Sequence, residues 1–137
     1  MSRRQILAGF ASAAVGLGGV GAQSRPLPAN DARLLALKAA LARADQWHEL
    51  CALDAGRDFT SSVAQAVAEA AQESALDAWE AVLFQMAETP AAGMVGVAVK
   101  AEQVALAVCA GSSAGEKALA ESLRADLARL VPGVVTA

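Results

Sequence analysis

Hydrophobic residues recur at helical spacing along most of this chain. From residue 31 to 55 they return every three or four positions, which places them on one face of a helix. The members of this face are Leu34, Leu37, Leu41, Ala44, His48 and Cys51. Asn30 or Asp31 is a good N-cap for this helix, and Gly56 follows its last turn. The pattern therefore predicts a first helix that ends at Gly56.

A second helix is predicted between residues 62 and 88. Its apolar stripe consists of Val63, Val67, Ala70, Ala71, Trp79, Val82, Leu83 and Met86. The acidic residues of its other side, which we expect to be a solvated face, are Glu69, Glu73, Asp77 and Glu80. Ser62 and Gln65 have the spacing of a capping box. Thr89 and Pro90 then suit the N-cap and the first position of a following helix.

Residues 91–110 form the third predicted element. The alternation of Val95, Val97 and Val99 is typical of a strand. The length of the segment, its alanine content and the Thr-Pro pair before it favour a helix, which is our prediction. Charged residues in the middle of the run exclude a membrane span. A fourth helix is predicted from a second capping box at Ser113 and Glu116 to Pro132.

Four helices joined by short turns predict an all-α fold, an antiparallel up-down bundle over residues 31–131 with a tail at 132–137. Composition agrees, because the chain has 36 alanines, no tyrosine and only 4% aromatic residues. Alanine favours helices, whereas sheets require β-branched and aromatic residues. A core rich in alanine is thin and leaves a small monomer marginally stable. We therefore expect a homodimer or another protein partner.

The N-terminal residues 1–22 read as an export signal. A basic start is followed by an apolar, glycine-rich run and a small-residue ending. The segment Ser-Arg-Arg-Gln-Ile-Leu resembles the twin-arginine signal family, from which it departs at Ile6 and Ala8. The resemblance implies that Arg3 and Arg4 are read by the export translocon. Cleavage is expected between Ala22 and Gln23, which leaves no membrane anchor and a periplasmic or secreted protein.

Alternatives for this N-terminal segment are an ordinary secretory signal, an uncleaved anchor, and a cytoplasmic protein with a tail. Residues 23–30 contain two prolines and are predicted to be a linker. The chain has a net charge of -3. Without residues 1–22, nine basic and fourteen acidic residues remain, a charge of -5. This balance argues against nucleic acid as a partner.

A second resemblance concerns residues 89–100. Thr89, Pro90, Gly96 and Lys100 match a Thr-Pro-Ala…Gly…Lys segment of small uncharacterised bacterial helical proteins, often with twin-arginine-like leaders. The chain departs from that segment at Gly93 and Val95. The Trp-Glu stretch at residues 79–80 is also similar. The resemblance implies an exported helical protein and carries no activity.

Few residues are suited to chemistry. His48 is the single histidine, and it lies one helical turn from Cys51, close enough for a Cys–His pair. No third group to orient them is evident, so we expect no catalytic residues, no metal and no cofactor. Cys51 and Cys109 form a disulfide if the chain matures in an oxidising compartment, or remain two buried thiols.

The sequence predicts an exported helical protein that binds another protein or is structural, without catalysis. The alternative is a periplasmic enzyme, or a module binding a small ligand or a metal, that uses His48 and Cys51.

Overall fold

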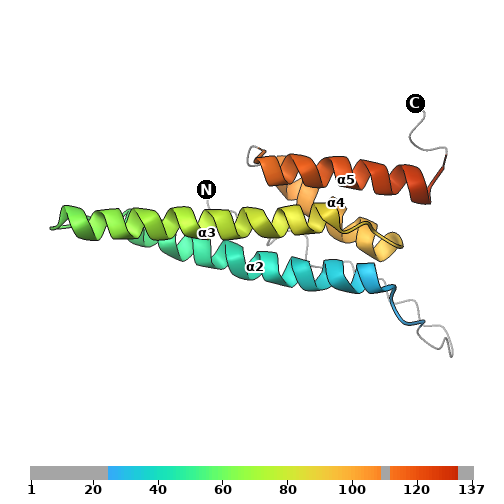
Figure 1. Ribbon diagram of the computed structural model, residues 1–137, viewed down its shortest axis with the longest axis horizontal. Coiled ribbons are helices and arrows are strands. Elements are labelled where there is room, and N and C mark those ends of the chain that lie inside the picture. Colours follow the sequence, from blue (N-terminus) through green and yellow to red (C-terminus); the bar gives the residue numbers. More distant parts are fainter. Residues whose placement is uncertain (1–24, 109–111, 133–137) are drawn as a thin grey trace.

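The part of the chain that this computed structural model describes, residues 25–108 and 112–132, consists of four helices (Figure 1). They are α2 (Ala29–Ala55), α3 (Ser62–Glu88), α4 (Met94–Val108) and α5 (Ala114–Leu130). The predicted all-α antiparallel bundle is confirmed. The predicted signal segment at residues 1–22 lies outside the described residues.

The bundle is built from two hairpins, α2–α3 and α4–α5, in which each helix runs opposite to the one before it. The hairpins pack with α2 beside α4 and α3 beside α5. Hydrogen bonds join Asp31 to Ala92 and Lys38 to Glu102, so α2 and α4 run in the same direction. Contacts of Glu80 with Gly115 and of Ala87 with Ser122 show the same for α3 and α5.

The two hairpins differ in length. The helices α2 and α3 have 27 residues each, whereas α4 has 15 and α5 has 17. The Lys38–Glu102 bond spans 64 positions and the Glu80–Gly115 bond spans 35. If the same offsets hold along the whole length of each helix pair, Val108 at the end of α4 lies opposite Ala44 of α2. In the same way, Ala114 at the start of α5 lies opposite Trp79 of α3. Residues 45–78, here called the free hairpin end, therefore project beyond α4 and α5 (Figure 1).

The hydrophobic core lies where the two hairpins overlap, here called the docked end. Its buried members are Leu34, Leu37, Leu41, Trp79, Leu83, Met86, Ala91, Val97, Val99 and Leu119. Leu123, Leu127 and Leu130 of α5 pack against this cluster. Farther along the hairpin, the buried residues are the smaller Cys51, Ala68 and Ala75. The leucines of the predicted face of the first helix are thus core residues.

Helix boundaries follow the prediction where the capping contacts are local. Ser113 accepts a hydrogen bond from the Glu116 amide, and the Glu116 carboxylate accepts one from the Ser113 amide, as the predicted capping box requires. Gly56 ends α2 as expected. The capping box predicted at Ser62 and Gln65 is wrong, because Ser61 is the N-cap and Gln65 donates to Glu69 instead.

Two other predicted caps are also wrong. α2 begins at Ala29 with Pro28 as its N-cap, rather than with the predicted cap at Asn30 or Asp31. The Asp31 side chain instead accepts hydrogen bonds from the Ala92 and Gly93 amides, in the segment before α4. Thr89 does not cap α4, which begins only at Met94; its hydroxyl donates to the Gln85 carbonyl at the end of α3. The third segment is helical, as predicted, over Met94–Val108.

Candidate functional site

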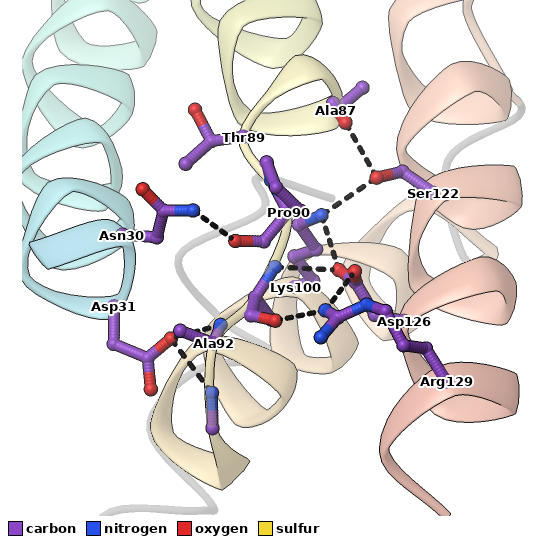
Figure 2. Close-up of polar contacts among 12 residues, drawn as sticks. Asn30, Asp31, Ala87, Thr89, Pro90, Ala92, Lys100, Ser122, Asp126 and Arg129 are labelled. Atoms are coloured by element: carbon purple, nitrogen blue, oxygen red, sulfur yellow. Dashed lines mark hydrogen bonds and ion pairs between the residues drawn. The ribbon is translucent and has the colours of Figure 1, made fainter. Parts of the chain in front are cut away.

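A buried ion pair joins α4 to α5. Lys100 has no exposed surface, and its ammonium group donates to an Asp126 carboxylate oxygen at 2.6 Å. It also donates to the Ser122 hydroxyl at 2.7 Å, and that hydroxyl donates to the Ala87 carbonyl at the end of α3. Lys100 of α4 is thus bound directly to α5 and is linked to α3 through the Ser122 hydroxyl (Figure 2).

The same carboxylate holds the segment that links α3 to α4. Asp126 accepts a hydrogen bond from the Ala91 amide at 3.0 Å. Arg129 donates to the Ala91 carbonyl and to the second Asp126 oxygen. Asn30, from α2, donates to the Pro90 carbonyl at 3.0 Å. The Thr-Pro-Ala segment is therefore fixed by side chains from both hairpins (Figure 2).

Asp31 supplies the cap that α4 lacks in its own sequence. One of its carboxylate oxygens accepts from the Ala92 and Gly93 amides at 2.7 and 3.1 Å. Both amides directly precede α4, and a carboxylate beside the start of a helix is stabilised by the partial positive charge there. A Cβ at Gly96 would lie 2.5 Å from the Asp31 carboxylate and 3.0 Å from Leu34. Gly96 is thus required by the close approach of α2.

Glu80 has the corresponding role at the start of α5. Its carboxylate accepts a hydrogen bond from the Gly115 amide at 3.0 Å. A Cβ at Gly115 would lie 2.9 Å from the Leu83 Cβ, so α3 and α5 also meet at a glycine. The prediction of a fully solvated acidic face is confirmed for Glu69, Glu73 and Asp77 but not for Glu80, which is half-buried.

Electrostatics favour an ionised Asp126. Burial raises the pKa of this carboxyl. Hydrogen bonds from Lys100, the Ala91 amide and Arg129, together with the Lys100 charge, lower the pKa by more than burial raises it. The net result is a pKa below the ordinary value of 3.8. The carboxylate is therefore charged at neutral pH and pairs with a cation on either side.

The contacts of this cluster indicate a structural role. Among the described residues, every buried side-chain nitrogen or oxygen has a hydrogen-bond partner. Lys100, Asp126 and Asp31 are each committed to neighbouring helices rather than directed toward an opening. Such a satisfied network fixes the relative placement of helices.

The cluster also contains the residues of the second resemblance. Pro90, Gly96 and Lys100 each lie where α4 or the segment before it contacts another helix, and Thr89 binds the last turn of α3. The motif thus corresponds in this chain to a packing arrangement. Comparison with family models, with curated proteins and with solved structures gives no match.

The residues predicted for chemistry lie elsewhere, in the free hairpin end. Cys51 is buried and lines a shallow hollow, whereas His48 is half-buried and is not part of that lining. Within the described ranges, no three His, Cys, Asp or Glu side chains are grouped to hold a metal ion. Cys109, Arg3, Arg4, Ala22 and Gln23 lie outside the described residues, so the disulfide and the signal stay predictions.

The free hairpin end carries the most exposed apolar side chains. Of the six large apolar residues more than half exposed in the described chain, five lie here: Trp47, Leu50, Leu53, Val63 and Val67. The sixth is Met94. Val63 and Val67 belong to the predicted apolar stripe of the second helix, but they are 71% and 66% exposed, because no helix of the described chain covers this part of the stripe.

The front side of the free hairpin end is the side of α2 and α3 on which α4 and α5 pack at the docked end. This front side is acidic. Asp45 and Glu49 follow Lys38 by seven and eleven residues, which places them on the side of α2 that faces α4. Glu69 and Glu73 precede Glu80 by eleven and seven residues, on the side of α3 that faces α5.

The opposite side, here called the back face, is apolar at its centre. Trp47 lies nine residues after Lys38, two and a half turns, and therefore points away from α4. Ala71 lies nine residues before Glu80 and points away from α5 for the same reason. We define the back face as Arg43, Trp47, Leu50 and Asp54 of α2 with Ala68 and Ala71 of α3. All but Ala68 are exposed.

The hollow beside Cys51 belongs to this back face. It is lined by Trp47, Leu50 and Cys51 of α2 and by Ala68 and Ala71 of α3, with Asp54 and Arg57 at its edge. Small residues on α3 leave room beside the large ones on α2. The hollow is shallow and mainly apolar, which suits an apolar side chain of another molecule.

Sequence reasoning missed Asp126, Arg129 and Ser122, and it gave Asp31 and Glu80 the wrong roles. One signal was present: Lys100 stands in the otherwise apolar run from Met94 to Ala101. A lysine in such a run requires an anionic partner when the run is buried. The sequence does not identify that partner, because several carboxylates lie at suitable positions on other helices.

Proposed function

We propose that this chain is an exported helical protein that binds another protein through its free hairpin end and carries out no reaction of its own. The docked end acts as the base from which the α2–α3 hairpin projects. The buried Lys100–Asp126 pair and the Asp31 and Glu80 caps hold that base together.

One observation carries the proposal: large apolar side chains are concentrated where the hairpin has no covering helix. Trp47 and Leu50 are 56% and 55% exposed, and they lie one turn apart on the same side of α2. Clustered exposed apolar residues with a polar surround are typical of protein interaction sites. Tryptophan in particular is enriched among the residues that dominate binding energy.

Export rests on residues 1–22 alone. The basic start with Arg3 and Arg4, the weakly apolar run and the small residues before Gln23 support a cleaved twin-arginine signal. Among the described helices, none has the length and uninterrupted apolarity of a transmembrane span. From the signal in residues 1–22 we propose a periplasmic or secreted location for the mature protein.

Site-specific crosslinking tests the binding proposal. A photoreactive amino acid replaces Leu50 or Val67 in the full chain, expressed in bacterial cells, and adducts are identified by mass spectrometry. We expect both positions to give a covalent adduct with a protein, and the same group at the exposed Ala128 of α5 to give none. The absence of adducts at both hairpin positions, with intact folding, would contradict the proposal.

Fractionation tests export. Replacing both Arg3 and Arg4 by alanine should retain the uncleaved precursor in the cytosol, while the Arg25→Ala control, outside the signal, should be exported normally. The intact mass of the exported form should lack residues 1–22. Normal export of the double variant would contradict the twin-arginine route, and a full-length exported form would contradict cleavage.

A further inference from the structure

We infer that the partner of the back face is the back face of a second copy of this chain, with the two α2 helices antiparallel. The inference rests on the proposed function and names the occupant of the proposed binding surface. Self-pairing of this kind forms a closed two-fold dimer, in which one patch contacts itself.

The order of side chains along α2 carries the argument. Arg43, Trp47, Leu50 and Asp54 are separated by four, three and four residues, the spacing of a coiled-coil stripe. The stripe has a cation at one end, an anion at the other and two large apolar residues between them. All four side chains are exposed in the described chain.

When two α2 helices pair antiparallel about a point midway between Trp47 and Leu50, each residue of the stripe faces a complementary residue of the second copy. Trp47 then faces Leu50 of the second copy, and Leu50 faces its Trp47. Arg43 faces Asp54 of the second copy at each end of the stripe. A parallel pairing in register instead places Arg43 against Arg43 and Asp54 against Asp54, which is unfavourable. The charges therefore select one direction.

The surface beside the stripe also fits a second copy. Ala68 and Ala71 of α3 and the hollow at Cys51 leave space for the large side chains of the opposing α2. Asp54 already contacts Arg57 at 3.2 Å in an exposed pair, so Arg43 of the second copy would place a second guanidinium beside this carboxylate. The acidic residues Asp45, Glu49, Glu69 and Glu73 lie on the front side, away from the contact.

The size of the contact sets the expected affinity. The stripe from Arg43 to Asp54 extends over three turns, about 17 Å of helix. With the α3 side chains included, two copies would bury on the order of 1,000 Å², the lower end of specific interfaces. We expect a dissociation constant on the order of 10 μM, and dimers that separate on dilution.

Sedimentation velocity over a concentration series tests the pairing through charge reversal. Arg43→Asp and Asp54→Arg should each weaken dimerisation of the full chain at least about tenfold, because each places like charges opposite one another. The double variant R43D/D54R should regain affinity to within about threefold. The Arg124→Asp control on α5 should leave dimerisation unchanged.

A mixture provides a second, independent check. The R43D chain and the D54R chain are each expected to self-associate poorly. An equimolar mixture should form a heterodimer about as tightly as the original chain, because opposite charges then meet at both ends of the stripe. Circular dichroism of each variant establishes that its helices are intact, so a loss of pairing is not a loss of folding.

The outcomes separate the inference from the proposed function. A dimer that ignores these charges, or single variants that neither the double variant nor the mixture rescues, would overturn antiparallel self-pairing. A monomeric chain whose Leu50 position crosslinks to a different protein would overturn self-pairing and leave the proposed function standing. A monomer without adducts, or one crosslinked to its own residues 1–24, would overturn both.

Discussion

The docked end and the free end of the α2–α3 hairpin use similar residues for different purposes. Leu34 and Leu83 at the docked end are almost completely buried, whereas Leu50 and Val67 at the free end are more than half exposed. The ion pairs of the two ends also differ in burial. Lys100 and Asp126 form a buried pair at the docked end, whereas Asp54 and Arg57 form an exposed pair at the free end. Buried packing is therefore concentrated at one end and exposed apolar surface at the other.

The largest expected effect is at the buried ion pair. Lys100→Met should lower the free energy of unfolding by about 3–5 kcal/mol, since it leaves Asp126 buried without its main cation. The exposed Lys38–Glu102 pair provides the matched control, because Lys38→Met should cost less than about 1 kcal/mol. Denaturant unfolding measures both. If the two lysine substitutions lowered the free energy of unfolding equally, burial would not determine how much an ion pair contributes to stability.

The next largest effect should come from the close approach of α2 and α4. Gly96→Ala introduces a Cβ 2.5 Å from the Asp31 carboxylate and should destabilise the fold by about 1–3 kcal/mol. At Gly56 of the free end, the nearest atom to an added Cβ is a carbonyl oxygen at 3.4 Å. Gly56→Ala should therefore change stability by less than about 0.5 kcal/mol. A harmless G96A would contradict the role of Asp31 as a cap pressed against α4.

Acid should weaken the docked end through Asp126. The pKa of this carboxyl is lowered in the folded chain, so its contribution to stability is full at neutral pH. The contribution is lost as the pH falls below the ordinary carboxyl pKa and through the lower folded value. The melting temperature of Asp126→Asn should consequently fall less between pH 6 and pH 3 than that of the original chain.

The smallest effect on folding is expected at the free end. Leu53→Ser should change the free energy of unfolding by less than about 0.5 kcal/mol, because Leu53 is 70% exposed. Leu83→Ala, on the other helix of the same hairpin, should cost about 2–5 kcal/mol. Thermal unfolding of both variants measures this contrast. A large loss for L53S would show that the free end is covered in solution.

Local signals in the sequence predicted the helices, because helical spacing and the Ser113 capping box act within a few residues. Such local signals do not predict how the two hairpins pack against each other. Asp31 was interpreted as a local cap, yet the amides that it contacts are 61 and 62 positions away. Nothing within one helical turn of Asp31 distinguishes these two roles.

The candidate site was predicted only in outline. Periodicity identified Val63 and Val67 as apolar members of a stripe, but it does not show whether another helix covers that stripe. Coverage depends on the lengths of α4 and α5 and on their register against the long hairpin. That register is set by Glu80, Gly115 and their counterparts Asp31 and Gly96, which are ordinary residues in the sequence.

The carboxylate caps donated by α2 and α3 also constrain the order of folding. Isolated helices of 15 and 17 residues such as α4 and α5 are marginal in water. Asp31 binds the backbone just before α4 and Glu80 binds the first turn of α5, and both carboxylates are correctly placed only once α2 and α3 have formed. The α2–α3 hairpin, built from contacts between adjacent helices, is thus the template, and closure over separations of 60 residues is the late, slow step. A ribosome would release a preformed hairpin before the second half of the chain docks on it.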